Sequence, residues 1–169
     1  MILKNVTANW LFINRVDDNG NYRVSFEVTK EQDAELKATL EEVAKANNTS
    51  LKDCDWSGSR KEENGVITYS AKASQEITLK DGTKKTVDLP VYNIRAQRFA
   101  DGEIPSVKNG ATVNVSVEPY FAKHKAKKGV MLGLRSIQLL KYELYEGDNP
   151  FKDESSDNAF GSEDEGVFQ

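Results

Sequence analysis

The chain has 169 residues, with 23 Lys or Arg, 27 Asp or Glu and a formal net charge of −4 at pH 7. A chain of this length buries roughly two-thirds of its unfolded surface, so one core suffices without disulfides or a structural metal. Its single cysteine excludes a disulfide scaffold. The sequence shows neither a secretion signal nor an apolar run close to the roughly 20 residues that span a bilayer. We therefore expect a cytoplasmic protein without membrane contact.

Two paired strands are predicted first. The stretch NYRVSFEV at residues 21–28 alternates apolar and polar side chains, which is typical of a half-buried strand. Asn19-Gly20 just before it favours a hairpin turn. The stretch VTANWLFIN at residues 6–14 is therefore the expected partner strand.

One amphipathic helix should follow these strands. Thr29 and Gln32 have the spacing of a capping box, and Asn47-Asn48 offers a plausible end. Between them, apolar residues recur at helical spacing and form one stripe, which should pack on a sheet: Leu36, Leu40, Val43 and Ala44.

The rest of the body is predicted to consist of strands and turns. Residues 51–65 are polar and predict a loop, and Asp81-Gly82 predicts a hairpin turn. The apolar phase slips at Leu139-Leu140, which indicates a β-bulge. Further strands are expected over residues 66–74, 91–99, 111–121 and 129–145.

Many short strands with one helix favour a mainly β fold, a sandwich or a small barrel, in one domain over residues 1–146. Residues 147–169 form a different segment, with seven acidic residues and one lysine, a net charge of −6. The preceding residues carry 22 basic and 20 acidic side chains. We expect a mildly basic body and a disordered acidic tail, because the tail has too few large apolar residues to offset the entropy of ordering.

Residues suited to catalysis are few. His124 is the only histidine and lies between two lysines, which disfavours both a metal and a protonated imidazole. Cys54 lies between Asp53 and Asp55, whose charges blunt it as a nucleophile. Neither a phosphate-binding glycine loop nor a nucleophile elbow is present. We therefore expect no enzyme, no cofactor and no metal, although the pairs Asp17/Asp18 and Asp53/Asp55 could bind a divalent ion.

A stronger signal is the mixture of aromatic and basic residues in YFAKHKAKKG at residues 120–129 and VYNIRAQRF at residues 91–99. Unpaired nucleic acid requires such a mixture, because cations follow the phosphates and exposed rings stack on bases. In the alternative interpretation the rings belong to the core and the lysines keep a loop soluble. Trp10 and Trp56 are further candidates, and Trp56 is expected to be the more exposed. The predicted contacts are Arg95, Arg98, Lys123, Lys125, Lys127, Lys128 and Arg135 for phosphates, and Tyr92, Phe99, Tyr120 and Phe121 for bases.

The tail combines acids with rings at Phe151, Phe160 and Phe168. Its final stretch suits a basic pocket on a partner, because the acids steer it and a ring supplies a buried anchor. A flexible polyanion would also compete with nucleic acid for the cationic body, at an effective concentration near millimolar. The alternative is a tail that only keeps the protein soluble. The predicted partner contacts are Glu163, Asp164, Glu165 and Phe168.

The stretch KHKAKKGVMLGLRSIQLL at residues 123–140, DNPF at residues 148–151 and the acidic tail with a nearly terminal Phe together resemble the single-stranded DNA-binding proteins of tailed bacteriophages. The family tail commonly ends on the ring, whereas Gln169 follows it here. The resemblance implies an OB-fold, although such a barrel usually places its helix between the third and fourth strands, later than the helix predicted here.

The resemblance also implies sequence-independent binding of single-stranded DNA in replication, recombination and repair. It implies contacts of the tail with the replicative DNA polymerase and the helicase-primase, and the possibility of a homodimer. A second hypothesis is a protein–protein adaptor of a replisome or virion without nucleic-acid binding. A third is a metal-dependent nuclease acting through Asp and Glu.

Overall fold

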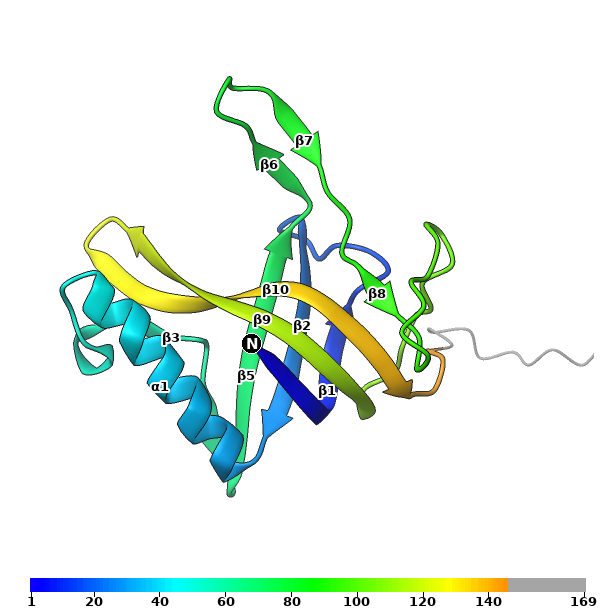
Figure 1. Cartoon of the computed structure of the whole chain (residues 1–169), viewed down its shortest axis with the longest axis horizontal. Helices are drawn as coiled ribbons and strands as arrows, with labels where there is room; N and C mark the ends of the chain where they lie inside the picture. Colours follow the sequence, from blue (N-terminus) through cyan, green and yellow to red (C-terminus); the bar gives the residue numbers. More distant parts are fainter. Residues whose placement is uncertain (146–169) are drawn as a thin grey trace, which may run out of the picture.

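The computed structural model describes residues 1–145, so the predicted tail and the domain boundary before it lie outside the described residues. Five long strands close a barrel in the order β1-β2-β5-β10-β9 and back to β1 (Figure 1). All neighbours are antiparallel except β5 and β10. This closed five-stranded Greek-key arrangement confirms the expected OB-fold. The barrel strands are β1 (Ile2–Phe12), β2 (Asn21–Val28), β5 (Val66–Ser74), β9 (Ala111–His124) and β10 (Lys127–Lys141).

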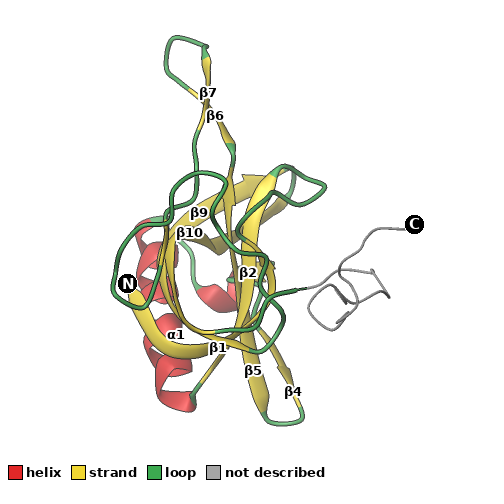
Figure 2. Ribbon diagram, turned by 90° about the vertical axis from the view of Figure 1, so that its right-hand side faces the viewer, coloured by secondary structure: helices red, strands yellow, loops and turns green. Residues whose placement is uncertain are grey.

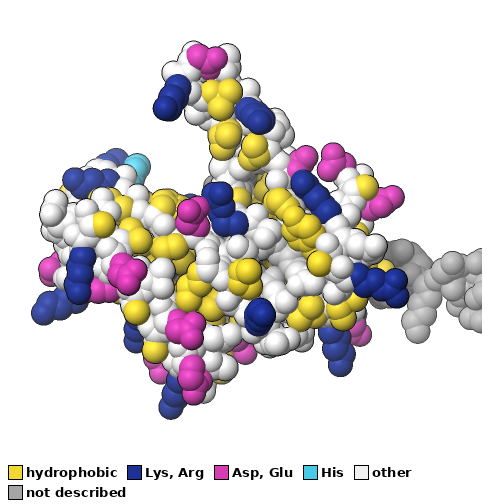
Figure 3. Space-filling view, in the orientation of Figure 1, with side chains coloured by type: hydrophobic (Ala, Val, Ile, Leu, Met, Phe, Trp, Pro, Cys, Tyr) yellow, Lys and Arg dark blue, Asp and Glu magenta, His cyan; other side chains and the backbone are white. Residues whose placement is uncertain are grey.

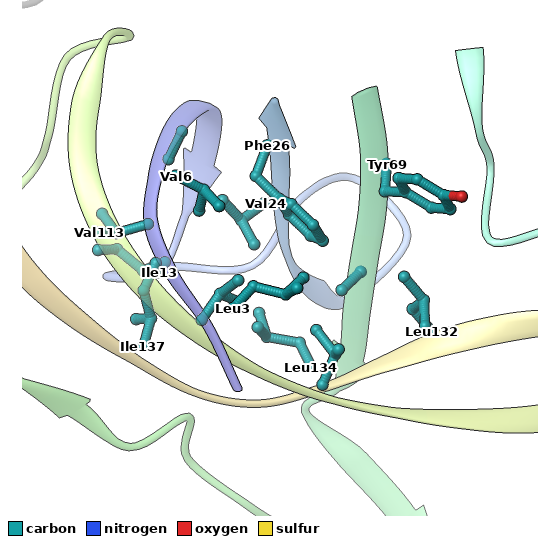
Figure 4. Close-up of a cluster of buried hydrophobic side chains, with 14 of the residues drawn as sticks. Leu3, Val6, Ile13, Val24, Phe26, Tyr69, Val113, Leu132, Leu134 and Ile137 are labelled. Carbon is teal, nitrogen blue, oxygen red and sulfur yellow. The ribbon is translucent and has the colours of Figure 1, made fainter. Parts of the chain in front are cut away.

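The barrel core comes from the alternating apolar positions of these strands. On β2 the residues Tyr22, Val24 and Phe26 face inward, and Arg23 and Ser25 between them face outward. The same alternation holds on β9, as the sequence predicted. Figure 4 shows side chains from these strands meeting inside the barrel.

Strand β10 changes phase twice. Its register against β9 shifts between Leu134 and Ser136, and again between Leu139 and Lys141. The second shift confirms the predicted bulge, and the first was not predicted. Arg135 points out of the barrel in the alternation that buries Leu132 and Leu134, and the first shift then moves the buried positions to Ile137 and Leu139.

Helix α1 (Lys30–Ala46) begins and ends where the sequence predicted. The Thr29 hydroxyl accepts the amide of Gln32, and the Gln32 side chain accepts the amide of Thr29, which completes the capping box. The helix lies between the second and third barrel strands and packs its apolar stripe on β9, β10 and β2. No helix within residues 1–145 is long and apolar enough to cross a membrane.

The polar segment at residues 51–65 is not only a loop. It contains a 3₁₀ turn η1 (Leu51–Asp53) and the strands β3 (Trp56–Ser57) and β4 (Lys61–Glu63), so the prediction was wrong there. Strand β3 pairs with β10 at Gly129, where a Cβ atom would lie 2.5 Å from the carbonyl oxygen of Trp56. A glycine in another strand permits this approach, which the local pattern of β3 does not reveal.

The predicted strand over residues 91–99 is mostly a turn. Only β8 (Val91–Tyr92) is extended, and it pairs with β10. The side-chain oxygen of Asn93 accepts the amides of Arg95 and Gln97 and closes the turn. This local side-chain bond competes with the ladder, which is why the prediction was wrong.

The hairpin predicted around Asp81-Gly82 is present as an arm. Strands β6 (Glu76–Thr78) and β7 (Lys84–Thr86) pair only with each other and project from the barrel (Figures 1 and 2). The arm follows β5 directly, so its base stands beside the seam where β5 meets β10.

A buried carboxylate ties the helix to the barrel. Asp33 is the one charged side chain buried among residues 1–145. Its oxygens accept hydrogen bonds from Arg60 at 2.8 and 3.0 Å and from the Tyr69 hydroxyl at 2.6 Å. The hydrogen bonds from Arg60 outweigh burial and lower the pKa of Asp33 to about 2.

Asp33→Asn is expected to lower the free energy of unfolding at pH 7 by about 2 kcal/mol, because the folded-state pKa lies below the ordinary value of 3.8. The contribution is complete above about pH 5 and falls as the pH approaches 2, so roughly half should remain at pH 3. Urea denaturation of both proteins at pH 7 and pH 3 measures it. Asp101→Asn, at an exposed acid, is the control. If the difference in free energy of unfolding between the two proteins were as large at pH 3 as at pH 7, this role would be contradicted.

Candidate nucleic-acid interface

Three hollows adjoin on the outside of the barrel. Hollow 1, about 510 Å³, lies over β2 and β5 beside Met131 of β10. Hollow 2, about 610 Å³, lies along the seam of β5 and β10 at the base of the arm, where Figure 3 shows the molecule notched. Hollow 3, about 480 Å³, lies between the end of β1 and residues 106–109. Lys72 lines hollows 1 and 2, and Trp10 lines hollows 1 and 3, so the three hollows form one continuous surface, here called the track.

Hollow 1 has a floor of small hydroxyls flanked by cations. Arg23 of β2 lies opposite Lys72 of β5, and Ser25 lies opposite Ser70 with their hydroxyl oxygens 2.8 Å apart. These residues face outward because their neighbours in each strand fill the core. Trp10 also lines this hollow and is 64% exposed. Small hydroxyls, cations and one large exposed ring therefore line the same hollow.

Hollow 2 holds a second exposed ring. Tyr120 of β9 is 41% exposed and packs against Gly133, where a Cβ atom would meet two of its ring carbons at 3.6 Å. Burial raises the pKa of Tyr120 further above its ordinary value of 10.0. Arg135 lines the same hollow and pairs with Glu118 at 3.1 Å. The glycine therefore lets the ring lie against the strand with part of its surface open to water.

Hollow 3 combines aromatic and basic side chains. The guanidinium carbons of Arg15 and Arg23 each lie 5.5 Å from the centre of the Phe12 ring. Asp17 holds Arg23 in turn, at 3.6 Å. Tyr145, 53% exposed, and Lys108 complete the hollow. The cation–π contacts hold these cations beside the ring.

The track as a whole is cationic and aromatic. Among the residues that the structure describes, no Asp or Glu lines hollow 1 or hollow 3, and only Asp88 and Glu118 line hollow 2. Such a surface fits an unpaired nucleic-acid strand, because cations attract phosphates and exposed rings stack on bases. The cations are Arg15, Arg23, Lys61, Lys72, Lys108 and Arg135, and the exposed rings are Trp10, Tyr120 and Tyr145.

No protein-family model matches the chain, and no curated protein is similar to it in sequence. Its structure is similar to gp2.5, a single-stranded DNA-binding protein encoded by bacteriophage T7, at 17% identity over 90% of this chain and 97% of that one, with a TM-score of 0.63. It is similar to the single-stranded DNA-binding protein from bacteriophage Enc34, at 14% identity over 92% and 88%, with a TM-score of 0.58. The Enc34 protein in complex with ssDNA is similar at 16% identity over 86% and 88%, also with a TM-score of 0.58. The chain shares the fold of phage single-stranded DNA-binding proteins.

Two of the predicted contact residues line the track, namely Tyr120 and Arg135. The predicted lysines lie instead on the hairpin that joins β9 to β10, where Lys123, Lys125 and Lys127 are exposed. Figure 3 shows basic side chains gathered there around the histidine. The hairpin extends from Met131, which lines hollow 1, so it adjoins the track at its middle hollow.

The remaining predicted contacts lie elsewhere. Phe99 and Phe121 are half-buried against the core, which leaves each ring only partly open for stacking. Tyr92 lines a separate hollow of about 220 Å³, with Ile2 and Gln138. Arg95 and Arg98 are exposed on the turn that follows β8. The structure does not bring these five residues to the track, and their contact with DNA stays a prediction.

The expected order of tryptophan exposure was wrong. Trp10 is the exposed one, whereas Trp56 is half-buried in β3. Sequence reasoning also missed most of the track. The alternation of β2 was enough to predict that Arg23 faces outward. That Arg23 lies opposite Lys72 depends on the pairing of β2 with β5, two strands far apart in the sequence. The missed residues are Phe12, Arg15, Arg23, Lys61, Lys72, Lys108 and Tyr145.

The acids considered for metal binding have structural contacts. The Asp17 carboxylate accepts the amides of Asn19 and Asn21, and Asp55 accepts the amide of Lys128. Within residues 1–145, no group of three or more His, Cys, Asp or Glu side chains could hold a metal ion.

Proposed function

We propose that this protein binds single-stranded DNA without sequence preference and is not an enzyme. The observation that carries the proposal is the continuous track of cations and exposed rings joined through Lys72 and Trp10. The shared fold supports it, since the named neighbours are single-stranded DNA-binding proteins and one of them was solved with ssDNA.

Binding divides between charges and rings. Arg23 and Lys72 lie opposite each other and would contact successive phosphates. Trp10 and Tyr120 would stack on bases, with about 1–3 kcal/mol for each stacked base. Every base presents a π-face, so stacking accepts any sequence, and a base paired inside a duplex cannot offer that face.

The lysines of the β9–β10 hairpin would extend this surface. Lys123, Lys125, Lys127 and Lys128 lie beyond Met131 on the β9–β10 hairpin, and Met131 of β10 lines hollow 1. A flexible phosphate backbone leaving the hollow would follow these charges. They would add to affinity and to its salt dependence without adding any base preference.

The wider role follows from this activity. A phage protein of this kind would protect unpaired DNA during replication, recombination and repair in the cytoplasm of the host cell. The acidic tail would recruit the replicative DNA polymerase and the helicase-primase through Glu163, Asp164, Glu165 and the Phe168 anchor. Formation of a homodimer stays a prediction.

Titration with oligo(dT) while following tryptophan emission tests the proposal. The chain has two tryptophans, and the exposed Trp10 should lose emission when a base stacks on it. Trp56→Phe should therefore keep the quenching, and Trp10→Phe should lose it. Affinity should fall with salt, with a log–log slope of about −0.7 for each phosphate contacted.

The same titration separates the alternatives. A protein that neither changes its emission nor shifts oligo(dT) in a gel would be an adaptor that acts through its tail. Cleavage of the oligonucleotide in magnesium would instead indicate a nuclease. A flat salt response would contradict phosphate contacts along the track.

A further inference from the structure

Strand β1 leaves its regular ladder at two places. Its register shifts against β9 between Leu3 and Val6, and against β2 between Asn9 and Phe12. Each irregular stretch contains a residue in the left-handed region, Asn5 at φ 56° and Trp10 at φ 54°. These are two bulges of similar backbone form in one strand.

The two bulges are held in the same way. The amide of Asn5 donates to the side-chain oxygen of Asn114 at 2.9 Å, and the amide of Trp10 donates to the side-chain oxygen of Asn109 at 2.8 Å. In each case an asparagine of the neighbouring segment satisfies the amide that the bulge removes from the ladder. The second bulge is braced further, since the amide of Gly110 donates to the side-chain oxygen of Asn9 at 3.0 Å.

The bulges differ in what the left-handed residue is. Asparagine adopts this region readily, because its short side chain bonds to the local backbone, whereas a bulky residue there is an outlier. Packing does not explain the outlier, because the Trp10 side chain is 64% exposed. Strain of this kind persists where the surroundings impose it, and it concentrates at functional sites.

The strained backbone sets where the ring lies. Trp10 lines both hollow 1 and hollow 3, so its indole stands at their junction. Asn9 lines hollow 1 and Asn109 lines hollow 3, so the two braces flank the ring along the track. In a regular strand the side chains alternate between the two faces, and the backbone bulge that holds the ring at this junction would be absent.

We propose that Asn109 is a positioning residue for Trp10, holding the left-handed bulge so that the indole divides the track into two subsites and stacks on an unpaired nucleic-acid base between them. The proposal rests on the proposed binding of single-stranded DNA. Asn109 acts through its bond to the Trp10 amide. Asn114 makes the matching bond at the bulge outside the track.

A double-mutant cycle tests the role. Asn109→Ala should weaken oligo(dT) binding by about 5-fold and reduce the quenching of Trp10, and Trp10→Ala should weaken it by about 10-fold, within the range for loss of a stacked base. Asn109→Ala added to Trp10→Ala should cost no further affinity, because the positioned ring is already gone. Asn114→Ala should lower the melting temperature about as much as Asn109→Ala and leave affinity unchanged.

A second variant covers the case in which Asn109→Ala does not fold. Trp10→Gly places at the bulge a residue that accepts the left-handed region, so its melting temperature should rise while oligo(dT) binding weakens by about 10-fold. A melting temperature that falls would overturn the claim that the ring is held under strain.

The outcomes separate the inference from the proposed function. A wild-type protein that does not bind oligo(dT) overturns both. A wild type that binds, with Trp10→Ala binding equally well, overturns the inference alone. An equal loss from Asn109→Ala in both backgrounds, or an equal loss from Asn114→Ala, would show that the brace does not act through Trp10.

Discussion

Replacing Arg23 and Lys72 together by glutamate is expected to weaken oligo(dT) binding by about 100-fold at moderate salt, because two phosphate contacts become two repulsions. These side chains lie opposite each other on β2 and β5 and line hollow 1. The log–log salt slope should become shallower by about 1.4, which corresponds to two phosphates. Fluorescence titration at several salt concentrations measures both effects.

The matched control is Lys30→Glu with Lys45→Glu. Both lysines are exposed on α1, and the pair changes the net charge by the same amount. If affinity depended only on net charge, the two double variants would bind equally weakly. Arg95→Glu with Arg98→Glu completes the set, and a larger loss from that pair than from Arg23 and Lys72 would move the binding site to the turn after β8.

Deleting residues 147–169 is expected to strengthen oligo(dT) binding by about 10-fold at low salt and by less at high salt. The deletion removes a charge of −6 that competes with DNA for the cations of the track. The end of the described chain supports this expectation. The amide of Tyr145 donates to the carbonyl of Ser106 at 2.8 Å, and both residues line hollow 3, so the last described residue lies at one end of the track.

Two variants of the full chain sharpen this test. Replacing the seven tail acids by their amides should raise affinity as much as the deletion does, because only charge is removed. Phe168→Ala should leave DNA binding near that of the wild type and lose the pull-down of polymerase. A truncated protein with equal or lower affinity would reject competition by the tail.

The elements that sequence reasoning predicted well are those with local causes. The capping box at Thr29, the apolar stripe of α1 and the alternation of β2 and β9 depend on residues a few positions apart. The hairpin at Asp81-Gly82 depends on a turn that its own residues specify. Together with the resemblance, these local signals sufficed to predict a small barrel with one helix.

The track depends on relations that a local pattern does not contain. Arg23 and Lys72 meet only because the register of β2 against β5 sets them opposite each other. Trp10 is exposed because a bulge held by Asn109 turns its backbone, and Trp56 is half-buried because Gly129 of β10 admits β3. Predicting the basic, aromatic character of the later chain was therefore easier than predicting which side chains gather.

The one parallel strand pair of the barrel, β5 with β10, forms late in translation and also lies under hollow 2. Hollow 2 lies along β5 and β10, and β10 is the last barrel strand to leave the ribosome. A nascent chain therefore lacks this hollow until nearly all of the barrel has been translated. A DNA strand lying across the closed junction would in turn oppose its opening, so occupancy should slow exchange of the β5 and β10 amides with solvent.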